Sequence, residues 1–117
     1  MREKMHAAHP NRSGLFDIKH DAGGMIDIEF AVQQLVIANA CRFPDLTKNL
    51  GNIALLGLAA RFSLIEKPLA EQSANAYREY RRLQHALRLN GAAYARVPPE
   101  QVAQHAEAVR QLWRAVF

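Results

Sequence analysis

The chain has 117 residues, of which 50% are hydrophobic, and its formal net charge is +4. This length suits one domain with its own core, and the hydrophobic content excludes a disordered tail. The modest charge, without a block of Lys and Arg, argues against nucleic-acid binding, and no apolar run is long enough to span a membrane. The sequence shows no secretory signal, and its single cysteine, Cys41, excludes an internal disulfide, so we expect a cytoplasmic protein.

The first part of the chain, residues 1–24, is polar and irregular. Within it, residues 15–19 alternate apolar and polar side chains, a pattern that predicts a short strand. We expect this strand to find no partner inside the chain, because the remainder of the sequence is helical in pattern. Residues 1–24 are therefore interpreted as the remnant arm of an upstream domain, and residues 25–117 as a helical domain.

Helical patterning begins at Met25, and the first helix is apolar almost all round, which predicts a helix buried on several sides. A second helix is expected over residues 52–61. Two further helices are predicted by stripes of apolar and small side chains at spacings of three and four, namely Leu69, Ser73, Ala76, Tyr80, Leu83 and Leu87, then Val102, Ala106, Val109, Leu112, Trp113 and Val116. The predicted fold class is all-α: a bundle of about four helices preceded by an irregular or strand-like N-terminal arm.

Basic residues gather on the third predicted helix, where Arg78, Arg81, Arg82, His85 and Arg88 share overlapping faces. A solvated face opposite the apolar stripe explains them best. A docking surface for phosphate or for an acidic partner is the alternative.

A pair of glycines, Gly23 and Gly24, stands just before two acids, Asp27 and Glu29. Adjacent glycines allow a tight turn and a close approach of the backbone to a ligand, and a helix that starts there favours an anion. On a strand, the two acids would share one face and could hold one Mg²⁺; on a helix they point about 200° apart. Because helical patterning begins here, we expect that only one of them can face a metal ion.

This stretch also carries a resemblance. The run Phe16–Lys19, followed by residues 23–30, resembles the glycine-glycine-acid-Ile-Glu-Phe motif of glutamine synthetase adenylyltransferases, which are bifunctional and are also called adenylyl-removing enzymes. Further matches at residues 2–5, 9–10 and 76–89 extend the resemblance over most of the chain. A looser version of the motif occurs in the related uridylyltransferases of nitrogen control.

The resemblance implies a part of an enzyme that transfers AMP from ATP to a tyrosine of glutamine synthetase, with Mg²⁺, while its other half removes the AMP by phosphorolysis. In that family the main metal carboxylates belong to an upstream Gly-Ser…Asp-x-Asp element, which this sequence lacks. We therefore expect a C-terminal fragment that is inactive alone and does not bind ATP tightly. The implied partners are glutamine synthetase, PII signal proteins and an upstream nucleotidyltransferase domain of the same chain.

The resemblance also assigns roles in the intact enzyme. Lys19 would reach a phosphate, and Gly23 and Gly24 would let the backbone approach the nucleotide. Asp27 or Glu29 would support the metal site, and Glu29 is preferred because family members accept either acid at the position of Asp27. The competing interpretation is a stand-alone helical interaction module that docks through the basic face of its third helix.

Overall fold

The computed structural model describes residues 14–48 and 50–117. In this part of the chain the elements are four α-helices, two short strands and two 3₁₀ turns: β1 (Phe16–Asp17), α2 (Met25–Asn39), η1 (Pro44–Thr47), α3 (Asn52–Arg61), α4 (Lys67–Leu89), β2 (Arg96–Val97), η2 (Pro99–Gln101) and α5 (Ala103–Val116). The expectation of a mainly helical bundle with a strand-like segment before it is confirmed. The sequence matches at residues 2–5 and 9–10 lie outside the described residues.

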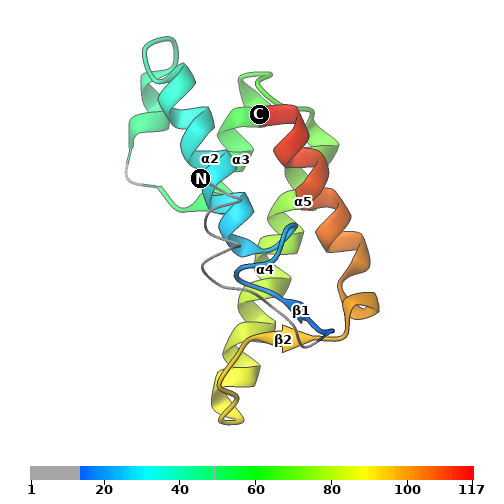
Figure 1. Cartoon of the computed structure of the whole chain (residues 1–117). Coiled ribbons are helices and arrows are strands. Elements are labelled where there is room, and N and C mark those ends of the chain that lie inside the picture. Colours follow the sequence, from blue (N-terminus) through cyan, green and yellow to red (C-terminus); the bar gives the residue numbers. More distant parts are fainter. Residues whose placement is uncertain (1–13, 49) are drawn as a thin grey trace.

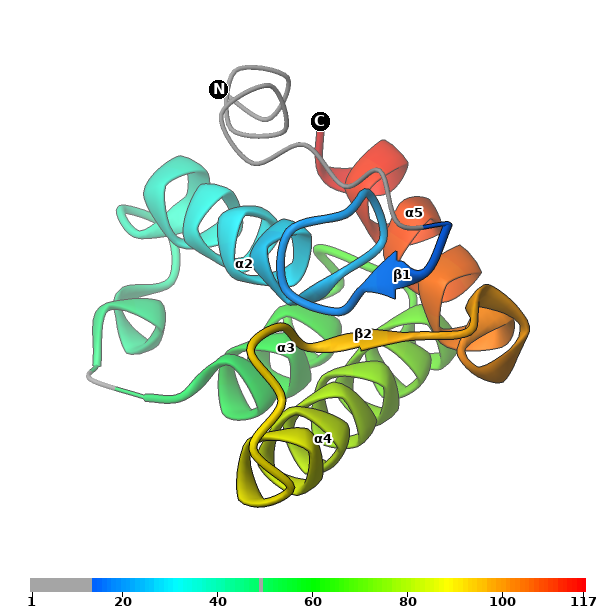
Figure 2. The same ribbon diagram turned by 60° about the horizontal axis from the view of Figure 1, so that its bottom comes forward.

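The longest helix, α4, forms the centre of the bundle and packs against α3 on one side and α5 on the other. Helix α2 packs against both α5 and α3 (Figure 1). The two strands lie side by side next to α4, as Figure 2 shows from below. No helix in the described ranges has the length and apolar character that crossing a membrane requires.

The ends of α4 follow directly from its sequence. Pro68 occupies the first turn, where its missing N–H is not needed. At the other end, Gly91 has a φ of 78°, and the N–H of Ala92 donates to the carbonyl of Leu87 at 3.0 Å. This reversal satisfies the last carbonyls of the helix and turns the chain back toward β2.

The hydrophobic core takes side chains from all four helices and from β1 and β2. Its largest fully buried members are Tyr80, Ile18, Ile28, Leu46, Leu56 and Leu112. The apolar stripe predicted for α4 faces this core, since Ser73, Ala76, Tyr80 and Leu83 are all buried. The stripe of α5 does the same through Val102, Ala106, Val109 and Leu112.

The expectation that the strand near residue 16 has no partner is wrong. Strand β1 pairs antiparallel with β2, so that Phe16 lies opposite Val97 and Asp17 opposite Arg96. The N–H of Ile18 continues the pairing by donating to the carbonyl of Ala95 at 2.8 Å. The missed partner is β2, whose two residues are too few to show alternation and whose pairing is fixed by tertiary packing rather than by local propensity.

The expectation that α2 is buried on several sides is also wrong. Its buried positions fall on one face and are spaced by one to three residues: Met25, Asp27, Ile28, Ala31, Val32 and Leu35. Ile37 on the opposite face is 67% exposed. The composition of the helix predicted more contacts than the described residues supply.

Candidate functional site

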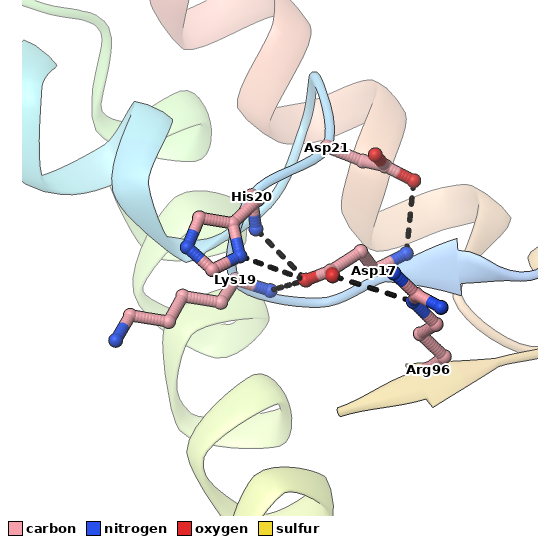
Figure 3. A network of polar contacts seen from close by, with 5 residues as sticks. All are labelled: Asp17, Lys19, His20, Asp21 and Arg96. Atoms are coloured by element: carbon pink, nitrogen blue, oxygen red, sulfur yellow. Dashed lines mark hydrogen bonds and ion pairs between the residues drawn. The ribbon is translucent and has the colours of Figure 1, made fainter. Parts of the chain in front are cut away.

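The segment between β1 and α2 is organised around the buried carboxylate of Asp17 (Figure 3). Its Oδ1 accepts hydrogen bonds from the backbone N–H groups of Lys19 and His20, both at 3.0 Å. A carboxylate that bonds the N–H groups two and three residues ahead is a common way to fix a tight turn. The chain therefore turns sharply after β1 and is redirected toward the start of α2.

A second set of contacts holds the same carboxylate from outside the turn. Arg96 on β2 approaches Oδ2 of Asp17 with its Nε at 3.6 Å, and Nδ1 of His20 lies 3.5 Å from Oδ1. On the far side, Oδ2 of Asp21 accepts the N–H of Asp17 at 2.9 Å (Figure 3). The guanidinium of Arg96 also stacks over the ring of Tyr94, 4.1 Å from its centre. Ion pairs and hydrogen bonds around Asp17 thus connect β1, the turn and β2 into one unit.

The two glycines allow this unit to pack closely on its neighbours. Gly23 has a φ of 90°, and a Cβ placed on it would lie 2.9 Å from the carbonyl oxygen of Ala106 on α5. A Cβ on Gly24 would lie 2.5 Å from the carbonyl oxygen of Ile18. Both distances are shorter than a carbon atom tolerates, so any larger residue would push the turn away from α5 or from β1. Packing within the chain is therefore sufficient to explain why glycine stands at both positions.

Asp27 fixes the same turn from within α2. Its side chain is 1% exposed, and its Oδ2 accepts the N–H of Gly23 at 2.8 Å. The hydroxyl of Tyr80 on α4 donates to the carbonyl of Gly23, also at 2.8 Å. Burial raises the pKa of the Tyr80 phenol above its ordinary value, and the neighbouring Asp27 carboxylate adds to the rise. Tyr80 therefore remains a neutral hydrogen-bond donor, and the Asp27 carboxylate has the structural role of holding the turn at Gly23.

Glu29 lies on a different side of the helix and is exposed. Its Oε1 is 3.4 Å from the hydroxyl of Tyr77 on α4, which in turn accepts a bond from Nδ2 of Asn52 at 3.2 Å. The two acids at the start of α2 thus point apart, as their spacing on a helix predicts. Of the pair, Glu29 is the carboxylate that a ligand outside the core can reach.

The structure separates the predicted site residues into two groups. Gly23, Gly24 and Asp27 are buried and bonded to one another or packed against the chain. Lys19 and Glu29 are exposed, and the side chain of Lys19 points away from the Asp17 carboxylate (Figure 3). Within residues 14–48 and 50–117, no three His, Cys, Asp or Glu side chains cluster closely enough to hold a metal ion.

The basic face of α4 is partly neutralised. Arg82 forms a salt bridge with Glu79 one turn earlier, and this bond lowers the pKa of the Glu79 carboxyl. Arg78 donates to Oδ1 of Asn75 at 2.9 Å. At Arg78 and Arg82 these contacts favour the solvated face over the docking surface.

Four residues that shape this region carried no distinct signal in the sequence. Asp17, Tyr77, Tyr80 and Arg96 come from three different elements. Tyr80 stood in the apolar stripe of α4, where a tyrosine with a buried hydroxyl needs a hydrogen-bond partner. That requirement could have singled out Tyr80, but its partner, the Gly23 carbonyl, could not be found without the fold.

Comparison with known proteins now places the chain. The model of the GlnD PII-uridylyltransferase family matches residues 1–110, and the chain belongs to this family of nucleotidyltransferases. More specifically, it is similar along its whole length to proteins named bifunctional glutamine synthetase adenylyltransferase/adenylyl-removing enzyme. Those of Burkholderia mallei, Bordetella bronchiseptica and Nitrosomonas europaea are 55%, 54% and 47% identical. The chain spans only 13%, 12% and 14% of these relatives, respectively.

Proposed function

We propose that this chain is the helical part of an enzyme that transfers AMP from ATP to a tyrosine of glutamine synthetase and whose other half removes that AMP. The observation that carries the proposal is the identity of 47–55% to relatives of that name along the entire chain. Such an enzyme would regulate nitrogen assimilation in the cytoplasm, under the control of PII signal proteins.

Glu29 is the residue that we assign to the metal. Mg²⁺ is commonly held by one or two protein carboxylates together with substrate phosphates, so a single exposed glutamate fits such a site. When bound, the ion would neutralise phosphate charge and activate the tyrosyl oxygen. Tyr77 orients the Glu29 carboxylate, while Asp27 acts indirectly by fixing the turn from which α2 starts.

Lys19 is assigned to nucleotide phosphate because its ammonium group is exposed next to the turn. For Gly23 and Gly24, a close approach of the nucleotide to the backbone stays a prediction. The packing of both glycines supports an indirect role, in which they set the position of Lys19 and Glu29.

Inactivity of the isolated chain belongs to the same proposal, since the other metal carboxylates would come from the upstream nucleotidyltransferase domain. Labelled ATP, Mg²⁺ and glutamine synthetase, incubated with this chain or with the whole parent enzyme, test it. We expect label on glutamine synthetase only with the parent. Transfer by the 117-residue chain would show that the active site lies within it.

Two substitutions in the parent enzyme test the roles of the acids. Glu29→Gln keeps the shape but removes the charge, and we expect the transfer rate to fall on the order of a hundredfold, with little change in melting temperature. Asp27→Asn should affect the rate less but lower the stability by about 1 to 3 kcal/mol, because a buried acceptor of the Gly23 N–H is weakened.

The matched control is Glu71→Gln, an exposed glutamate on α4 that should leave both rate and stability unchanged. A normal rate for Glu29→Gln would assign that residue a structural role. The rival proposal, a stand-alone module that docks through α4, predicts that no acid substitution affects transfer. The pairing of Arg82 with Glu79 gives that rival no support.

A further inference from the structure

A small cavity lies between the turn after β1, the C-terminal end of α4 and the segment that leads to β2. Its volume is about 230 Å³, and its polar wall is formed by Asp17, Lys19, His20, Gln84, Arg88 and Tyr94. Two of the segments that resemble the adenylyltransferase family, residues 16–19 and 76–89, therefore meet at one place. The spacing of Lys19 and Arg88 along the chain does not indicate that they lie together.

The cavity contains more positive than negative charge. The side chains of Lys19 and Arg88 both line it, and neither has an ion pair with an acid in the described ranges. Arg96 lies directly behind the Asp17 carboxylate, and its Nε is buried without a hydrogen-bond acceptor in the described structure. Two basic side chains, Lys19 and Arg88, thus line the cavity, and a third, Arg96, is paired with the Asp17 carboxylate outside the lining.

The nearby carboxylates are already engaged. Both oxygens of Asp17 are used, one by the N–H groups of Lys19 and His20 and the other by the ion pair with Arg96. The carboxylate of Asp21 binds the N–H of Asp17 on the side away from Lys19 (Figure 3). The cavity consequently offers the positive charges of Lys19 and Arg88, while the one carboxylate that lines it, that of Asp17, is already held by other groups.

We propose that this cavity binds a phosphoryl anion, either inorganic phosphate or the terminal phosphate of a di- or triphosphate. Arg88 can present two parallel N–H groups to phosphate oxygens, and Lys19 supplies a second charge from the opposite wall. The volume is below the range of about 300 to 1,000 Å³ that is typical of sites for whole organic ligands. A phosphate group fits this space, and a nucleoside would remain outside it. The proposal sharpens the role of Lys19 but stands without AMP transfer, because the isolated chain can be tested for binding.

The test is a titration of the 117-residue chain, followed by amide chemical shifts in NMR spectra. Inorganic phosphate, pyrophosphate and ATP are compared with sodium chloride at equal ionic strength. We expect saturable shifts at residues 17–20 and 88–95 with all three phosphate compounds and none with chloride. ATP should bind no more than a few-fold tighter than pyrophosphate, since only phosphate enters the cavity. Shifts spread evenly over basic residues, or equal shifts with chloride, would overturn the proposal.

A second experiment removes the two positive charges that line the cavity. Lys19→Gln combined with Arg88→Gln keeps polar side chains but removes both charges, and should weaken phosphate binding at least about tenfold. The double variant should melt at the same or a higher temperature in phosphate-free buffer, because two like charges have been removed. Phosphate should raise the melting temperature of the unmodified chain but not that of the variant.

The control is Arg82→Gln, which removes a positive charge from the same helix outside the cavity, where it pairs with Glu79. We expect its phosphate affinity to match that of the unmodified chain. Equal weakening by the control and by the double variant would mean that phosphate senses only net charge, and the assignment of the cavity would be wrong.

Discussion

The two ends of α2 differ sharply, although the helix is apolar along its whole length. At its start, Gly23, Gly24 and Met25 are bonded to Asp27, Asp21 and Ile18, and Tyr80 reaches the turn from α4. Near its end, Ile37 is 67% exposed, and Asn39 makes only local hydrogen bonds, from its side chain to the carbonyl of Leu35 and from the N–H groups of Arg42 and Phe43 to its own carbonyl. The two ends are alike in composition. Long-range contacts hold the start of the helix, whereas its end remains exposed at Ile37.

The difference shows which features the local sequence predicts and which depend on contacts between distant residues. An apolar helix must be buried somewhere, but the sequence does not say which face finds a partner. The start of α2 is held by residues from β1, α4 and α5, and each contributes a contact that the others cannot replace. Three comparisons between variants test this contrast.

The largest effect is expected from one substitution made at both ends of the helix. Ile28→Ala removes a side chain with no exposure and should cost about 3 to 4 kcal/mol of unfolding free energy, because it leaves a cavity in the core. Ile37→Ala should change stability by less than about 0.5 kcal/mol. Urea unfolding of both variants measures the difference. Similar losses would mean that the two ends are equally buried in solution.

A second comparison uses glycines. Gly24→Ala should cost about 3 kcal/mol, because the new methyl group would lie 2.5 Å from the Ile18 carbonyl, a backbone atom that cannot move independently. Gly57→Ala is the matched control, since a Cβ at that position on α3 meets nothing within 4 Å. Alanine there should add up to about 1 kcal/mol, as expected inside a helix. Thermal melts that show no loss for Gly24→Ala would contradict the close approach of the turn to β1.

The smallest effect concerns the hydrogen bond between Tyr80 and the Gly23 carbonyl. Tyr80→Phe should cost about 1 kcal/mol near neutral pH. The raised pKa of Tyr80 also gives a pH signature, because the unfolded phenol ionises near its ordinary value of about 10 while the folded one stays protonated. The stabilisation is present below that pH and is lost as the pH rises above it.

Unfolding measured at pH 8 and pH 11 should therefore show the unmodified chain losing more stability than Tyr80→Phe. Tyr94→Phe, at a position that is 63% exposed, serves as the control and should follow the unmodified chain. If Tyr80→Phe and the unmodified chain lose equal stability, the phenol is not held in its protonated form by the fold.

Much of the fold followed from the sequence because helices carry a periodic signal. The residue range 52–61 coincides with α3, and the stripe through Leu69 and Leu87 predicted α4. The helix ends at Leu89, just before Asn90 and Gly91, which are residue types typical of helix ends. Each of these features depends on residues within a few positions of one another.

The features that were missed all depend on distant residues. Strand β2 has only two residues, and its partner β1 lies on the other side of three helices in sequence. The cavity next to Lys19 needs Arg88, which appeared in the sequence only as one of several basic residues on a helix. For the candidate site, the sequence pointed to the segment of residues 16–30 but could not divide it into buried residues and exposed ones such as Glu29.

The pairing of β1 with β2 has a consequence for the synthesis of the protein. Residue 16 leaves the ribosome long before residue 97, and at about 5 to 20 residues per second the interval is on the order of ten seconds. During that time α2, α3 and α4 can begin to associate, whereas Phe16 and Asp17 have no strand to join. The turn with Gly23 and Gly24 also needs α5, which emerges later still. The contacts that fix the turn are therefore completed only after α5 has been made, and until β2 has been made β1 lacks the strand that pairs with it in the folded chain.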